Sequence, residues 1–215
     1  AAITVALISG AAADRMKFSA WMTFATLWAV LVYFPVAHWV FAFDGVVTEG
    51  SVGGWIANKL KAIDFAGGTA VHINAGAAAL AVAIVLGKGA NWGKLRKPHN
   101  VPLTLLGAGL LWAGWYAFNG GSALAAGNSA AIVMVTTFVA TCAATLAWLA
   151  VEKIKDGHVT GVGAAAGAIT GLVAITPACG SVTPVGAIIL GLVAGAICPY
   201  AVGLKEKFGY DDSLD

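Results

Sequence analysis

The chain has 215 residues, of which 60% are hydrophobic and only 10% are charged, and its mean hydropathy is +0.86. A soluble domain carries about 25% charged residues, so the composition excludes a water-soluble globular protein and predicts an integral membrane protein. The formal net charge of +2 gives no reason to expect a nucleic-acid partner, because membrane topology accounts for the basic residues.

Long apolar stretches, divided by charges, prolines and glycines, predict transmembrane helices. The runs are continuously apolar rather than alternating, which argues against a β-barrel. We therefore expect an all-α, polytopic transmembrane helix bundle with six full helices and part of a seventh. The partial one is an apolar segment at 1–11, and the full helices cover 18–41, 65–87, 102–121, 130–151, 160–177 and 184–203.

The two ends of the chain and its basic residues suggest how it is organised. Residue 1 lies inside an apolar run, so we expect a single integral-membrane domain, 1–215, that is a fragment truncated at both ends. Ten of the 12 Lys and Arg residues fall in alternate loops, which the positive-inside rule places in the cytoplasm. Residues 88–97 are then cytoplasmic, and residues 44–63 face outside with Lys59 and Lys61.

His72 is the most informative residue of the chain. It lies within 23 residues that carry no formal charge, between Asp64 and Lys88. With a helix starting at 65, it would lie about 12 Å below the helix start, near the membrane midplane. An ionisable group at that depth is a candidate functional site, and the alternative is a histidine hydrogen-bonded to a neighbouring helix.

Asp64 precedes the same apolar helix. A carboxylate at a helix N-terminus accepts the backbone N–H groups that have no intrahelical partner, so a structural role is expected first. Its negative charge would also ease the approach of a cation from outside.

The repeated glycines and the three cysteines are weaker candidates for a functional role. Glycines recur every four residues, which favours close packing of transmembrane helices. Cys142, Cys179 and Cys198 are scattered without metal-ligand spacing, so no metal or cofactor is expected. The spaced glycines are Gly163, Gly167 and Gly171, followed by Gly191 and Gly195.

An aromatic stretch ends the helix predicted at 102–121. Tryptophan and tyrosine there are typical of an interfacial belt, but Phe118 lacks the polar tip of an anchor. Ser122 lies four residues later, on the same face if the helix continues through the glycines. An aromatic face with a hydroxyl acceptor suits a small cation that carries N–H donors.

Five ordered motifs make the chain resemble the ammonium transporter (Amt/Mep/Rh) family along its whole length. They are Asp64-Phe65-Ala66-Gly67-Gly68 followed by Val71-His72-Ile73-Asn74, then Lys97-Pro98-His99-Asn100, Phe118-Asn119-Gly120-Gly121-Ser122, Thr176-Pro177-Ala178-Cys179-Gly180 and Tyr210-Asp211-Asp212-Ser213. The resemblance implies a fold of eleven transmembrane helices, of which this chain supplies the end of the third to the ninth. It further implies a homotrimer with one pore per subunit, a location in the plasma membrane and, as a possible partner, a cytoplasmic PII-type regulatory protein.

The resemblance also assigns roles to individual residues. His72 resembles the first of two paired pore histidines, and Ser122 the external hydroxyl that accepts from ammonium. Phe118 resembles the inner phenylalanine of the gate, Asp64 the carboxylate that supports the external site, and Thr176 a pore-lining threonine.

Two departures from the family pattern affect the site. Phe41 stands where the family usually has the tryptophan of the outer aromatic cage. Phenylalanine attracts cations less than tryptophan does, so external affinity is lower or Trp39 substitutes. The second pore histidine and the outer gate phenylalanine lie beyond the two ends of the chain, so the chain alone does not form the complete pathway.

The implied mechanism is recruitment of ammonium outside, deprotonation, and passage of neutral ammonia, which avoids most of the desolvation penalty of a cation. A sensor of the same fold with little conduction is the alternative. An intramembrane enzyme is disfavoured, because neither an HExxH motif nor a Gly-x-Ser-x-Gly elbow occurs.

Overall fold

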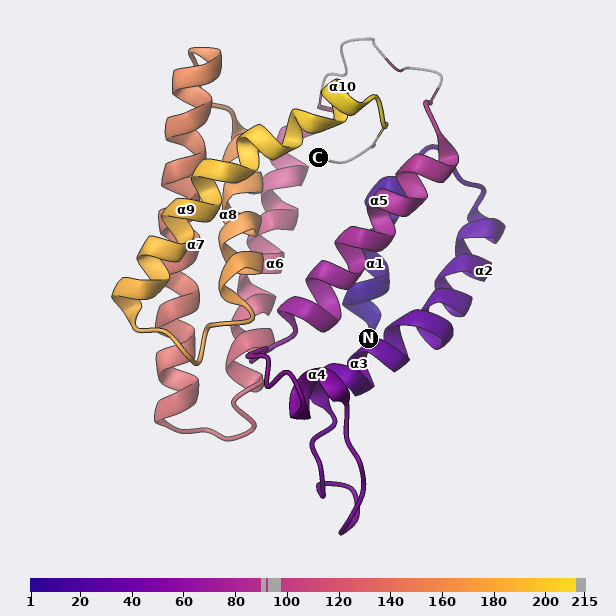
Figure 1. Cartoon of the computed structure of the whole chain (residues 1–215). Helices are drawn as coiled ribbons and strands as arrows, with labels where there is room; N and C mark the ends of the chain where they lie inside the picture. Colours follow the sequence, from indigo (N-terminus) through magenta and orange to yellow (C-terminus); the bar gives the residue numbers. More distant parts are fainter. Residues whose placement is uncertain (90–91, 93–97, 212–215) are drawn as a thin grey trace. The chain divides into compact units, whose positions relative to one another are not determined.

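The computed structural model describes residues 1–89, 92 and 98–211. Within them every regular element is a helix, which confirms the predicted all-α class. The described part of the chain packs as two compact units, one formed by residues 1–94 and 205–215 and the other by residues 95–204 (Figure 1). The single domain expected from the sequence stays a prediction. Lys94, Arg96, Lys97 and residues 212–215 lie outside the described residues.

The first unit contains two apolar helices that each include a π-helical turn. Pro35 has no N–H to give the carbonyl of Leu31 its α-helical bond, which favours a wider turn just before it. The helix α1 packs against α5. The elements of this unit are α1 (Ala2–Ala12), α2 (Phe18–Trp28), η1 (Ala29–Tyr33), α3 (Phe34–Phe41), α4 (Trp55–Asn58), η2 (Gly68–Ile73), α5 (Asn74–Leu86) and α10 (Leu204–Phe208).

A buried ion pair joins the end of the described chain to the rest of this unit. Arg15 lies 3.8 Å from Asp211, and both side chains are almost fully buried. Asp211 also accepts a hydrogen bond from the backbone N–H of Gly89 at 2.7 Å, and Arg15 donates to the carbonyl of Gly87. These contacts explain why residues 205–211 pack with the first unit.

The second unit is a bundle of four helices, α6 (Val101–Gly121), α7 (Asn128–Asp156), α8 (Gly161–Ile175) and α9 (Pro184–Val202). Side chains cap three of them, because Asn100, Thr160 and Thr183 each accept from a backbone N–H of the first turn. The 29-residue helix α7 is in contact with the other three.

The spaced glycines lie where α8 and α9 meet α7, which confirms the predicted close packing. A Cβ built on Gly171 would lie 2.7 Å from the Cα of Thr141, and one built on Gly167 would lie 2.9 Å from the Cα of Thr145. A Cβ on Gly191 or Gly195 would collide with the carbonyl oxygens of Ala140 and Ala144. Only glycine allows these backbones to approach so closely.

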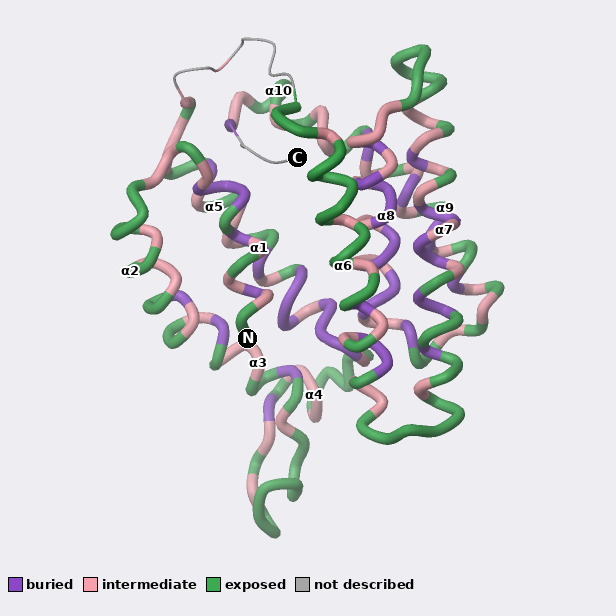
Figure 2. The backbone as a smooth tube through the Cα atoms, turned by 180° about the vertical axis from the view of Figure 1, so that it is seen from behind, coloured by how far each residue is buried: buried purple, intermediate pink, exposed green. Residues whose placement is uncertain are grey.

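Five helices in the described part of the chain are long and apolar enough to cross a membrane: Phe18–Phe41, Gly68–Leu86, Val101–Gly121, Asn128–Asp156 and Pro184–Phe208. The stretch predicted as a helix at 160–177 is shorter, because α8 ends at Ile175 after 15 residues, or roughly 22 Å. A turn follows, in which Ala178 donates to the carbonyl of Ile175. Much of each of these helices is exposed (green in Figure 2), and many of the exposed residues have large apolar side chains, as lipid contact requires.

Candidate functional site

The Asp64 carboxylate caps the helix that carries His72. Its Oδ1 accepts from the backbone N–H of Gly67 and Gly68 at 2.8 and 2.5 Å, and its Oδ2 accepts from Thr69 and Ala70 at 2.7 and 3.3 Å. Four backbone N–H groups without intrahelical partners therefore donate hydrogen bonds to the negatively charged carboxylate of Asp64. The predicted structural role of Asp64 is confirmed, and its effect on an approaching cation stays a prediction.

The cap moves the helix start and changes the depth of His72. Gly67 has a φ of +113°, so it lies in the left-handed region, and helical structure begins at Gly68 rather than at residue 65. His72 is then the fifth helical residue, about 6 Å from the helix start. The distance of about 12 Å expected from the sequence was wrong, because Asp64 binds the N–H groups that would otherwise open the helix earlier.

His72 lies on the buried side of its helix. The side chain of His72 is 9% exposed, whereas that of the next residue, Ile73, is 67% exposed. The turn is π-helical, and the backbone N–H of His72 bonds to the carbonyl of Gly67, five residues back, at 3.3 Å. Single π-helical turns inside α-helices recur at functional sites.

Phe41 and Trp39 have different neighbours. The Cζ of Phe41 lies 3.6 Å from the position that a Cβ on Gly67 would occupy, so its ring lies beside the turn that Asp64 caps. The ring of Trp39 instead packs at 6.0 Å, centroid to centroid, from the ring of Trp55 in α4. Phe41 therefore lies beside the start of the His72 helix, and Trp39 packs against α4.

In the second unit, Phe118 and Ser122 are joined at the end of α6. The helix continues through the glycines to Gly121, and the Ser122 hydroxyl donates to the carbonyl of Phe118 at 2.8 Å. Because its one proton is used there, the Ser122 oxygen can only accept a further bond. The ring of Phe118 lies 5.7 Å from that of Trp115, at an interplanar angle of 58°.

Thr176 is fully buried just after α8. Its hydroxyl accepts from the indole N–H of Trp115 at 2.9 Å and donates to the carbonyl of Leu172 at 2.7 Å. Asn119 adds a second link, since its Nδ2 donates to Thr137 of α7 at 3.0 Å. Trp115, Asn119 and Thr137 were not singled out from the sequence, although an asparagine beside Phe118 in an apolar helix was an available signal.

The predicted site residues fall into two separate groups, one in each unit. Asp64, Phe41 and His72 share the first unit, and Phe118, Ser122 and Thr176 share the second. Their convergence on one pore stays a prediction.

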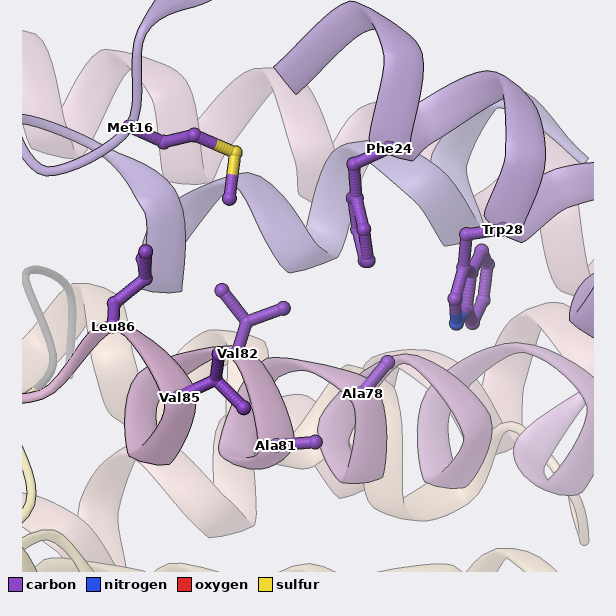
Figure 3. A pocket seen from close by; sticks show the side chains of 8 residues that line it. All are labelled: Met16, Phe24, Trp28, Ala78, Ala81, Val82, Val85 and Leu86. Carbon is purple, nitrogen blue, oxygen red and sulfur yellow. The ribbon is translucent and has the colours of Figure 1, made fainter. Parts of the chain in front are cut away.

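An apolar groove of about 280 Å³ lies in the first unit, between α2 and α5 (Figure 3). It offers no hydrogen-bonding partner suited to ammonium and contains none of the predicted site residues. Its lining consists of Met16, Phe24, Trp28, Ala78, Ala81, Val82, Val85 and Leu86.

Comparison with known proteins identifies the family. The model of the Ammonium Transporter Family matches residues 1–215. The chain belongs to the ammonium transporter family. It is 63% identical over 216 residues to an ammonium transporter of Mycobacterium tuberculosis, a match that covers 100% of this chain and 45% of the relative. The resemblance expected from the five motifs is confirmed.

Solved structures agree with this ammonium transporter assignment. Mep2 of Candida albicans superposes with a TM-score of 0.88 at 38% identity, over 99% of this chain and 46% of that one. A structure described as a sensor Amt protein also has a TM-score of 0.88, at 31% identity, over 99% of this chain and 53% of that one. The chain thus spans about half the length of the relatives that it matches.

Proposed function

We propose that the full-length protein transports ammonium or ammonia across the membrane rather than catalysing a reaction. The observation that carries this proposal is the Ser122–Phe118 pair. The Ser122 proton is committed to the Phe118 carbonyl, so the serine oxygen presents an acceptor one helical turn after the aromatic residue Phe118. A small cation with N–H donors is bound well by such a combination. Membership of the ammonium transporter family supports the same substrate.

The proposed mechanism begins at the outer end of the pathway. Ammonium is recruited there by Ser122, with Phe41 or Trp39 as the aromatic partner, and the capped Asp64 supports the site through its negative charge. Ammonium then loses a proton, because a bare cation in an apolar pore is strongly disfavoured while neutral ammonia is not. Ammonia passes Phe118, and the His72 imidazole accepts and passes the proton, which its two different ring nitrogens allow. Thr176 lies along the same path.

Transport by the reconstituted full-length protein tests this proposal. An ammonium concentration jump across proteoliposomes on a supported membrane should produce a current well above that of protein-free liposomes. Internal alkalinisation, followed with a pH dye, would report passage of neutral ammonia instead. If neither signal exceeds that of empty liposomes, the transport proposal is wrong.

Ser122→Ala should weaken ammonium binding. The substitution removes one hydrogen-bond acceptor, which is worth about 1 kcal/mol, so the concentration for half-maximal current should rise about fivefold. The maximal current should change little, because the route past Phe118 is intact. Ammonium titration of the current measures both quantities. An unchanged half-saturation value would remove Ser122 from the external site.

The basic loops are proposed to be cytoplasmic in a multi-pass plasma-membrane protein. A cysteine placed at the exposed Lys155 should react with a membrane-impermeant thiol reagent only after cells are opened. A cysteine at the exposed Lys59 should react in intact cells. The background lacks Cys142, Cys179 and Cys198. Labelling of position 155 in intact cells would reverse the proposed orientation.

The resemblance also proposes an assembly and a regulator. We propose a homotrimer, which native mass spectrometry of the detergent-solubilised protein tests, with a PII-type protein as the partner at the cytoplasmic face. A monomeric or dimeric species alone would contradict the trimer.

A sensor that binds ammonium without conducting it is the second candidate. The similarity to a sensor Amt protein favours it. Saturable ammonium binding without current or alkalinisation would support the sensor, whereas a current that saturates with ammonium supports the transporter.

A further inference from the structure

The residues of the last turn of α6 stabilise its helical conformation only weakly. It contains Gly120 and Gly121, between Phe118 and Ser122. Each glycine in a helix is about 1 kcal/mol less favourable than alanine, and glycine has no side chain to pack. The positions of the Phe118 ring and the Ser122 hydroxyl therefore depend on contacts from other helices.

One such contact is the bridge from Asn119 to α7. The Asn119 side chain is fully buried, and its Nδ2 donates to the Thr137 hydroxyl oxygen at 3.0 Å. Its Oδ1 lies 3.4 Å from the Thr176 hydroxyl, but the single Thr176 proton is better placed on the carbonyl of Leu172 at 2.7 Å. The bond to Thr137 is thus the stronger of the two links that hold Asn119.

The hydrogen bond between Asn119 and Thr137 is directional and is shielded from water. Thr137 is also fully buried, so breaking the bond would leave part of a buried amide unsatisfied, which is costly. Since Asn119 follows Phe118 directly and precedes Ser122 by three residues, fixing its side chain fixes the rotation of the turn that carries both.

We propose that Thr137 is a positioning residue for the external ammonium site. Its hydroxyl holds Asn119, and through Asn119 it sets the distance and angle between the Phe118 ring and the Ser122 oxygen. Thr137 acts without touching the substrate. The role rests on the proposed function, because it concerns the affinity of that same site for ammonium.

The experiment compares two buried threonines of α7 in the full-length protein. Thr137→Val keeps the side-chain shape and removes the acceptor. The control is Thr141→Val, one turn further on, whose equally buried hydroxyl donates to the carbonyl of Thr137 within the same helix. We expect Thr137→Val to raise the half-saturating ammonium concentration about fivefold, with less than a twofold change in maximal current. Thr137→Ser, which restores a hydroxyl, should return the wild-type value, and Thr141→Val should retain it.

Two outcomes would overturn the positioning role while transport itself stands. One is a wild-type half-saturation value for Thr137→Val. The other is an equal rise for Thr141→Val, which would indicate a general packing effect. If Thr137→Val does not fold, Thr137→Cys, with similar volume and a weak sulfur acceptor, takes its place. Absence of current or alkalinisation in the wild-type protein would instead refute the proposed function and this role together.

Discussion

Replacing His72 with alanine in the full-length protein is expected to reduce ammonium-driven current by about 100-fold or more, the lower end of what a positioned proton-transfer group contributes. Imidazole is the only ionisable side chain between Asp64 and Lys88, and a methyl group cannot accept or pass a proton. Folding and membrane insertion should be unaffected, because an apolar residue replaces a polar one within an apolar helix. Currents measured with ammonium and with methylammonium test the effect.

The neighbouring residue supplies the control. Ile73→Ala truncates a side chain of the same π-helical turn that is 67% exposed, and it should keep the wild-type current. If His72→Ala carries the wild-type ammonium current with the wild-type cation selectivity, His72 is a packing residue and the proton-relay role is wrong.

Gly195→Val is expected to prevent stable folding of the second unit. Any Cβ at this position would collide with the carbonyl oxygen of Ala144, and a backbone atom in the middle of α7 cannot move aside as a side-chain tip can. Helices α7 and α9 would have to separate, at a cost of about 3 kcal/mol or more. The expected result is loss of the folded protein from membranes, measured by size-exclusion chromatography after detergent extraction.

Val193→Leu is the matched control, because it adds volume to an exposed position of the same helix. It should give wild-type yield and elution. A Gly195→Val protein that elutes and melts like the wild type would show that the contact between α9 and α7 is looser than described.

The helices could be predicted from the sequence because length and apolarity alone define them. Local chemistry could be predicted where both partners are close in sequence, as for Asp64 and the start of η2. The exact start at Gly68 could not, because it depends on how many N–H groups one carboxylate binds. The π-helical turn at His72 could likewise not be predicted from a pattern that assumes 3.6 residues per turn.

The contacts within the second unit were less predictable. Trp115 and Thr176 are 61 residues apart, so their hydrogen bond depends on the packing of α6 against α8. Asn119 and Thr137 likewise meet only after α6 and α7 have paired. Apolar periodicity says which stretches are helices, but it does not say which faces of two membrane helices meet, since lipid and protein interiors are equally apolar.

The buried pair of Arg15 and Asp211 has a consequence for the order of folding during synthesis. The bond from Gly89 to Asp211 closes a loop between residues 122 positions apart, at an entropic cost of about 4 kcal/mol if the intervening chain is unstructured. That cost falls when α6 to α9 have already formed a bundle, because the bundle shortens the effective loop. Helices α6 to α9 are therefore synthesised, and can form their bundle, before Asp211 is available to bond to Gly89 and Arg15. Nascent chains stalled before Asp211 should leave Arg15 accessible to proteases.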